Sequence, residues 1–239
     1  MEYLETMGKS KFTISTLTYI FYLILVMISL SSCNTGGKND QLLIPLQRGN
    51  LWKYQGNYNG KPVSCCMEVH DILKKGNLTF ALMKGFPTDV MEGENWEPSV
   101  WGLLAVGNEH YYKVSGNRID SIDQKLSDNG NVQSGLVNDS DIFLEALYGT
   151  GQTFGEAAQL TRDDGNYFWK VTGKQAFEPS AVRGLKLMGP FDSYSLTYKT
   201  VADETIMDVV PGIGIVRYRY SHHGTPAELD MKLAETGIQ

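Results

Sequence analysis

The chain has 239 residues, a formal net charge of -6 at pH 7, 42% hydrophobic residues and 20% charged residues. These fractions are those of a folded globular protein and exclude a disordered chain. The acidic balance argues against nucleic acid as a partner, because binding to phosphates requires clustered positive charge.

An uncharged apolar run, residues 12–30, lies near the N-terminus (FTISTLTYIFYLILVMISL). Lys9 and Lys11 precede it, which gives the positive and apolar regions of a secretory signal peptide. A transmembrane helix is the alternative, since a run of about 20 residues can span a bilayer. The Ser and Thr residues inside the run, and the lack of a basic cluster after it, favour the signal peptide.

The apolar run ends in the motif LSSC, residues 30–33. This motif resembles the lipobox of bacterial lipoproteins, L-[AST]-[GAS]-C. The resemblance implies that residues 1–32 are removed and that fatty acyl chains, such as palmitate, on Cys33 anchor the protein in a membrane. Residues 33–41 then form a flexible tether. Asn34 stands where some Gram-negative lipoproteins carry an inner-membrane retention aspartate, so the outer membrane is favoured in a Gram-negative cell.

Residues 42–239 are predicted to form a single domain of mainly antiparallel strands. Aromatic or aliphatic residues alternate with polar ones in four segments: 51–58, 167–171, 194–198 and 215–222. A period of two places each set on its own face of a strand. Asn-Gly, Gly-Asn and Asp-Gly pairs between such segments predict tight turns. The pattern is typical of a curved sheet that forms a half-open barrel or a sandwich.

One segment, residues 139–149 (DSDIFLEALYG), has apolar residues at helical spacing instead. Asp139 or Ser140 is a candidate N-cap, and Gly149 is a candidate C-cap. The sequence therefore predicts one short helix in the domain, which covers an end or a face of the sheet. The signal peptide is expected to form a second helix before the domain.

Two motifs lie near the two ends of the domain. IPLQRGNLWKY, residues 44–54, places a turn before aromatic residues, and VVPGIGIVRYRY, residues 209–220, places a glycine-rich bend before a strand. They resemble the opening "PLxxGNxWxY" and the "aPGIGlVk" hairpin of a module found in many uncharacterised bacterial lipoproteins. The resemblance implies a β-rich structure, similar to the open barrels of lipoprotein-localisation factors. It implies no catalytic residue.

Aromatic side chains are the candidate ligand-binding groups of this domain. By alternation, Trp52, Tyr54, Tyr198, Tyr218 and Tyr220 share one face of the predicted sheet. If the sheet is an open barrel, these rings line its concave side and bind an apolar ligand. The alternative is that they form a filled core.

A second candidate is the stretch MEGENWEPSVW, residues 91–101, in which Trp96 and Trp101 lie among glutamates that include Glu92. Indole rings stack on sugars and carboxylates accept hydrogen bonds from sugar hydroxyls. The stretch thus fits glycan binding, or a surface enzyme that cleaves polysaccharide with two carboxylates across a cleft. The alternative is a loop fixed to the core by its tryptophans.

The cysteines and histidines of the domain predict neither a disulfide nor a metal site. Cys65 and Cys66 are adjacent in a predicted strand, where their Cα atoms lie too close for an ordinary disulfide. His222 and His223 are adjacent too, so they point to opposite faces of a strand. His70 and His110 stand alone in the sequence. We expect no metal and no cofactor.

Taken together, these patterns predict a lipid-anchored cell-envelope lipoprotein with a non-catalytic binding or assembly domain. Its expected partners are the membrane, through the lipid on Cys33, and an apolar ligand, a glycan or another envelope protein. The alternative is a surface enzyme that acts on polysaccharide through the carboxylates of residues 91–101.

Overall fold

The computed structural model describes residues 42–93, 95–127, 135, 137–147, 149–186 and 190–239. The predicted signal peptide, Cys33 and the tether lie outside the described residues. Within the described part of the chain, no helix is long and apolar enough to cross a membrane.

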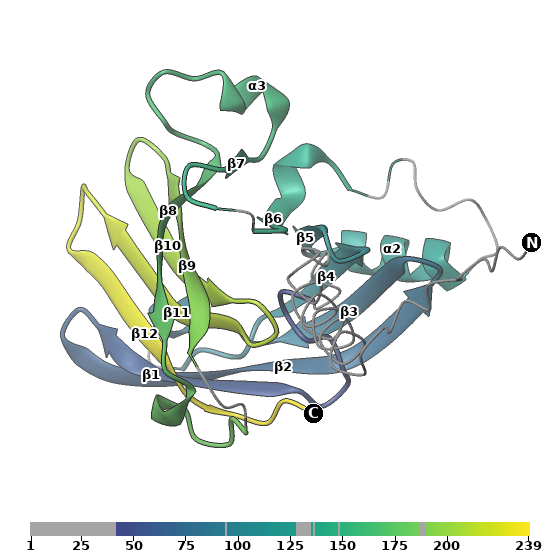
Figure 1. Ribbon diagram of the computed structural model, residues 1–239, viewed down its shortest axis with the longest axis horizontal. Coiled ribbons are helices and arrows are strands. Elements are labelled where there is room, and N and C mark those ends of the chain that lie inside the picture. The colour runs from purple at the N-terminus through teal and green to yellow at the C-terminus, as the bar shows by residue number, and fades with distance from the viewer. Residues whose placement is uncertain (1–41, 94, 128–134, 136, 148, 187–189) are drawn as a thin grey trace, which may run out of the picture. The chain divides into compact units, whose positions relative to one another are not determined.

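Twelve strands of the described residues form one antiparallel sheet, which confirms the mainly β prediction. The strands are β1 (Leu51–Tyr58), β2 (Lys61–Lys75), β3 (Leu78–Lys84), β4 (Val100–Val106), β5 (His110–Val114), β6 (Ile142–Glu145), β7 (Thr153–Phe154), β8 (Trp169–Phe177), β9 (Phe191–Lys199), β10 (Asp203–Val210), β11 (Gly214–His222) and β12 (Ala227–Thr236). Their order in the sheet is β6-β5-β4-β3-β2-β1-β12-β11-β10-β9-β8-β7 (Figure 1). The first and last strands therefore pair at the centre, and β6 and β7 are the edges.

The tight turns of the first hairpins were predicted correctly. Asn59-Gly60 joins β1 to β2, and Gly76-Asn77 joins β2 to β3. Asn59 and Gly60 have φ values of 50° and 78°. Positive φ at both central positions defines the type I′ turn, whose twist matches that of paired strands.

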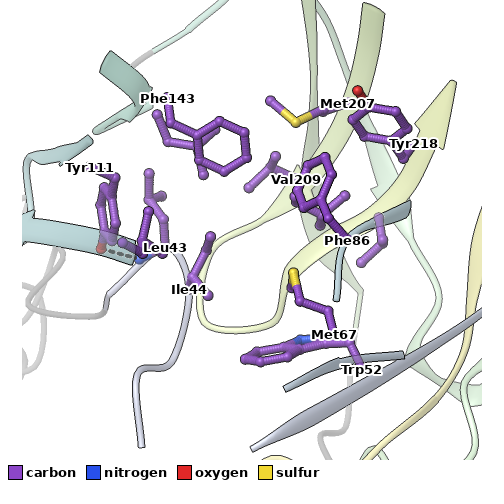
Figure 2. Packing of buried hydrophobic residues seen from close by; sticks show 14 of the residues in the cluster. Leu43, Ile44, Trp52, Met67, Phe86, Tyr111, Phe143, Met207, Val209 and Tyr218 are labelled. Carbon is purple, nitrogen blue, oxygen red and sulfur yellow. Dashed lines mark hydrogen bonds between the residues drawn. The ribbon is translucent and has the colours of Figure 1, made fainter. Parts of the chain in front are cut away.

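The sheet curls so that strands far apart in its order meet on its inner face. Phe86, just after β3, lies 5.3 Å from Tyr218 of β11, measured between ring centroids. In a flat sheet these strands would be roughly 19 Å apart, four ladder spacings. The inner face therefore encloses one core, part of which Figure 2 shows.

The two terminal motifs meet in this core. The Trp52 indole Nε1 donates a hydrogen bond to the carbonyl of Ile213 at 2.6 Å. The Tyr54 hydroxyl donates to the carbonyl of Ile215 at 2.9 Å. Aromatic residues of the first motif thus satisfy backbone groups of the second, which explains in physical terms why both motifs belong to one fold.

A smaller cluster lies on the outer face of the sheet. Helix α2 (Arg118–Ser127) places Ile122 and Leu126 against Phe80 of β3 and Leu104 of β4. The remaining helical pieces are short: η1 (Pro87–Met91), η2 (Asp139–Asp141), α3 (Ala157–Leu160) and η3 (Pro179–Ala181).

The predicted helix at residues 139–149 is wrong. Only Asp139–Asp141 forms a single 3-10 turn, and β6 follows at once. In β6, Leu144 pairs with Tyr111 and Ile142 pairs with Tyr112, both of β5. Edge pairing and burial of neighbouring apolar residues outweigh the helical spacing, because tertiary contacts override local propensity.

The cysteine pair lies in a strand, as predicted. Cys65 and Cys66 are both free thiols on β2, the first buried and the second exposed. Burial raises the pKa of the Cys65 thiol to about 12, helped by the nearby Asp89 carboxylate. Cys65 is therefore a protonated, apolar core group.

Candidate functional site

The two edges of the sheet meet at a seam, formed by β6, β7 and the described residues between them, 146, 147 and 149–152. The side-chain amide of Gln152 donates to the carbonyl of Ala146 at 2.7 Å. Across the seam, the rings of Phe143 and Trp169 lie 6.5 Å apart. In the described residues, β6 and β7 share no strand ladder, and side-chain contacts bring the two edges together.

A cavity of about 140 Å³ lies at this seam and is called the seam pocket below. Its aromatic lining is Tyr167, Trp169 and Tyr198, and its polar lining is Asp139, Ser140, Glu156 and Gln159. Ile142 and Gly155 complete it. The lining residues come from η2, β6, the β7–β8 segment, β8 and β9, so the pocket forms only when both edges are in place.

The pairing of β8 with β9 positions the aromatic lining. Trp169 and Tyr198 are directly opposite each other in this ladder, with ring centroids 5.1 Å apart. Phe154 of β7 stacks on Trp169 from the seam side, at 6.3 Å. Trp169 is 8% exposed, whereas Tyr167 and Tyr198 are half-buried and can contact a ligand.

Tyr167 has an unusual backbone conformation, with φ at 68°. For a bulky residue this left-handed value costs roughly 1–3 kcal/mol, and such strain is concentrated at binding and catalytic sites. The Tyr167 amide donates to the carbonyl of Lys199 at 2.7 Å, and Arg162 lies over the ring at 4.9 Å. These contacts hold the strained residue at the pocket.

Gly155 permits a close approach of backbones at the pocket wall. Its φ is +145°, and a Cβ at this position would lie 3.3 Å from the Cβ of Phe168. A side chain here would be strained, since L-residues rarely adopt this conformation. The glycine therefore lets the β7–β8 segment lie against the start of β8.

The electrostatic character of the seam pocket is negative. Asp139 and Glu156 are exposed carboxylates, and among the described residues no basic side chain lines the cavity. Burial and the neighbouring Tyr167 raise the pKa of Tyr198, so its hydroxyl stays protonated and can donate a hydrogen bond. Asp141 does not add to this negative charge, because Arg118 neutralises its carboxylate through two hydrogen bonds of 2.6 and 2.7 Å.

Most aromatic residues proposed from the sequence lie in the core. Trp52, Tyr54, Trp101 and Tyr218 are each 6% exposed or less and belong to the inner cluster. The indole of Trp101 donates to the carbonyl of Gly85 at 3.1 Å. These four rings fill the interior of the sheet, as the core alternative describes.

The other proposed residues are more accessible. Trp96 is half-buried and packs on the edge of the core, while Glu92 and Glu97 are exposed. Glu94 lies outside the described residues. Trp96 and Trp101 are therefore not equivalent, since only Trp96 keeps surface that a sugar could contact.

Tyr220 lines an open groove of about 610 Å³ on β10, β11, β12 and the end of the β1–β2 hairpin. Its hydroxyl donates to Asp203 at 2.6 Å, and His222 Nδ1 lies 2.7 Å from the same carboxylate oxygen. Three charged groups of the groove are paired: Glu204 with Lys199, Asp230 with Arg217, and Arg219 with Asp208. The groove is large, but its charges are largely neutralised by neighbours.

Metal ligation has no candidate in the described part of the chain, where no group of three or more His, Cys, Asp or Glu side chains could hold an ion. His223 is exposed, beside the His222 that binds Asp203.

Lys113 of β5 is an unusual charged group on the inner face. Its Nζ lies 3.7 Å from the ring centroid of Phe86, and the rings of Trp101 and Phe143 lie 5.1 and 5.8 Å away. Burial lowers the pKa of this amine to about 8, although the Asp89 carboxylate acts in the opposite direction. The amine is held by aromatic faces.

Comparisons with known proteins find two solved structures of low similarity. No protein-family model and no curated protein matches the sequence. A solved structure from Bacteroides fragilis, described as an exported protein with a YmcC-like fold, has a TM-score of 0.46 and 11% identity, covering 82% of this chain and 99% of that one. One from Parabacteroides distasonis, described as a lipoprotein, has a TM-score of 0.41 and 12% identity, covering 84% and 100%. Neither assigns a function to this chain.

The seam pocket was not predicted as a site from the sequence. The sequence placed Tyr167 and Trp169 on one face of a strand, and Tyr198 among the aromatic residues of the concave face. It did not predict that the three side chains lie around one cavity. The turn Asp164-Gly165 before two aromatic positions was the available signal. These residues come together only when the sheet closes, and no local sequence pattern predicts that closure.

Proposed function

We propose that the chain is a lipid-anchored cell-envelope protein whose β domain is a non-catalytic binding module, with the seam pocket as its binding site. The observation that carries this proposal is the pocket itself, in which three aromatic rings and two carboxylates converge from both edges of the sheet. A concave site with aromatic walls and a few convergent polar groups is the usual form of a ligand site. The LSSC motif supports the anchor, and Asn34 favours the outer membrane in a Gram-negative cell.

The anchor is tested by metabolic labelling with an alkyne analogue of palmitate. The wild-type chain is expected to take up the label, and its mature form is expected to begin at a lipid-modified Cys33 by mass spectrometry. The variant Cys33→Ala should remain unlabelled. Equal labelling of wild type and variant would contradict the proposed anchor.

Binding is tested with the processed protein in a polyoxyethylene detergent, which carries neither a sugar nor an ammonium group. The probes are glucose, palmitate and choline, each compared by its effect on the melting temperature. A compound that binds the folded state raises this temperature. We expect at least one probe to do so and to be recovered chemically unchanged.

The variant Tyr198→Leu is expected to abolish the effect of that probe, because Tyr198 lines the pocket. Tyr58→Leu is the matched control, since Tyr58 is also half-buried but does not line the pocket. If no probe changes the melting temperature, or if both variants behave alike, the binding proposal is wrong.

A further inference from the structure

We infer that the seam pocket recognises an organic cation, an ammonium group with small alkyl substituents; this inference rests on the proposed binding function. The aromatic lining is the first reason. Trp169, Tyr167 and Tyr198 all belong to the residue types that attract cations most strongly, because the face of an electron-rich ring is negative. A tryptophan and two tyrosines around one cavity form an aromatic cage.

The carboxylates at the rim are the second reason. Asp139 comes from η2 on the β6 side, and Glu156 comes from the segment after β7. A ligand between the two edges therefore meets a negative charge on each side. An anion would be repelled there, and a neutral ligand would gain little from the second carboxylate.

The way in which Tyr167 is held is the third reason. Its strained backbone and the Arg162 guanidinium over its ring fix the ring at the pocket wall. Arg162 is in turn held by Asp164, with its Nε 3.0 Å from a carboxylate oxygen. The chain thus already uses this ring as a cation acceptor, and the ring is ordered before a ligand arrives, which reduces the entropy cost of binding.

The size of the cavity limits the ligand to a head group. A cavity of about 150 Å³ holds a molecule of the size of benzene, whereas sites for larger ligands measure about 300–1,000 Å³. The seam pocket, at about 140 Å³, has room for a trialkylammonium or a similar amine. That group could belong to a free amine or to the head group of a lipid, which share the same chemistry.

Titration calorimetry of the processed protein tests the charge requirement. Choline is compared with 3,3-dimethylbutan-1-ol, which has the same shape but carries carbon in place of the charged nitrogen. We expect choline to bind about tenfold more tightly or better, since shape and apolar area are matched and only the charge differs. Equal affinity for the two compounds would overturn the inference.

Variants locate the effect at the pocket. Glu156→Gln is expected to weaken choline binding about threefold and to leave the neutral analogue unchanged. Glu97→Gln is the control, because Glu97 is also exposed and loses the same charge but lies outside the pocket lining. Tyr167→Asn removes the ring but keeps a residue that tolerates positive φ. This variant should weaken choline binding about tenfold without lowering the melting temperature. If Glu97→Gln weakens choline as much as Glu156→Gln does, a pocket for cations is excluded.

Glycerophosphocholine distinguishes the two sources of the cation. Tighter binding than choline assigns the site to a lipid head group, and weaker binding assigns it to a free amine; either supports the inference. If glucose or palmitate binds in a Tyr198-dependent way and choline does not, the inference is wrong and the binding module stands. If none of the compounds binds, both the inference of a cation site and the proposed binding function are wrong.

Discussion

The two halves of the sheet differ in what covers their outer faces. The helix-covered half consists of β3, β4 and β5 with α2, and its outer face is apolar: Phe80 and Leu104 pack against Ile122. The inner face of the same strands is also buried. These strands therefore bury apolar residues on both faces.

The polar-faced half consists of β8 to β12, and its outer face carries hydrogen-bonded side chains. The hydroxyls of Thr172 and Thr197 lie 3.0 Å apart on neighbouring strands. The Ser195 hydroxyl donates to Asp208 at 2.6 Å. Arg217 binds Asp230 through hydrogen bonds of 2.9 and 2.6 Å.

The two outer faces of the sheet are therefore stabilised in different ways. The helix-covered half gains burial on a second face, which contributes free energy in proportion to apolar area. The polar-faced half gains cross-strand pairs, each of which contributes far less. We therefore expect substitutions on the two outer faces to differ in cost.

The largest effect is expected in the helix-covered half. Leu104→Ala removes a side chain that is 1% exposed between the sheet and α2. The cavity and the lost transfer energy should lower the free energy of unfolding by about 2–5 kcal/mol. Urea denaturation followed by circular dichroism measures it. Lys170→Ala, exposed on β8, is the control and should cost less than about 0.5 kcal/mol. A loss below about 1 kcal/mol for Leu104→Ala would show that α2 does not bury this face.

The second effect concerns the most buried charge of the polar-faced half. Asp208 is 3% exposed, accepts the Ser195 hydroxyl and lies 3.5 Å from Arg219. Asp208→Ala leaves these groups without their partner, and we expect a loss of about 1–3 kcal/mol. Asp192→Ala, whose exposed carboxylate pairs with Lys174, is the control and should stay within about 0.5 kcal/mol. Equal losses would mean that burial of Asp208 has no energetic consequence.

A third effect tests the inner face of the helix-covered half through pH. The pKa of Lys113 is lowered to about 8 in the folded chain, so between about pH 8 and 10 the unfolded chain binds more protons. Stability due to Lys113 therefore rises with pH in this window. Burial raises the pKa of Cys65 to about 12, which acts with the opposite sign.

The difference in stability between wild type and Lys113→Met isolates the lysine, because Cys65 is present in both. Relative to the variant, the wild type should gain on the order of 1 kcal/mol between pH 7.5 and about 9.5, after a discount for solvent screening. Urea denaturation at several pH values measures it. A difference that is independent of pH would contradict the lowered pKa of Lys113.

The same comparison explains which parts of the fold were predictable. In the polar-faced half, alternation in residues 194–198 and 215–222 predicted β9 and β11, because one face is apolar and the other polar. In the helix-covered half, β4 (VWGLLAV) has no alternation, since both faces are buried. The helix α2 was missed as well, because few of its residues are apolar and the turn pair Gly116-Asn117 before it suggested a loop.

The candidate site was less predictable than the fold. Trp169 and Tyr198 were placed in strands correctly, whereas the predicted strand position of Tyr167 is wrong, because Tyr167 lies in a bend with positive φ before β8 begins. The proximity of the three rings to Asp139 and Ile142 depends on the closeness of β6 and β7. The prediction of a helix at 139–149 removed β6 from the sheet and with it the seam. Local patterns report which face a side chain occupies, whereas closure results from the accumulated curl of all twelve strands.

The smallest effect expected is that of an ion pair in the polar-faced half. Arg217 holds the pKa of Asp230 below its usual value, so the stability that this pair contributes is present above about pH 4 and is lost as pH falls through the lowered pKa. A double-mutant cycle with Arg217→Met and Asp230→Asn should give a coupling of about 0.2–1 kcal/mol at pH 7, because both groups are partly exposed. The coupling should shrink in 1 M salt and as the pH falls through the lowered pKa of Asp230. A coupling above about 2 kcal/mol would place this pair on a par with Asp208 and remove the distinction between buried and exposed charges on this face.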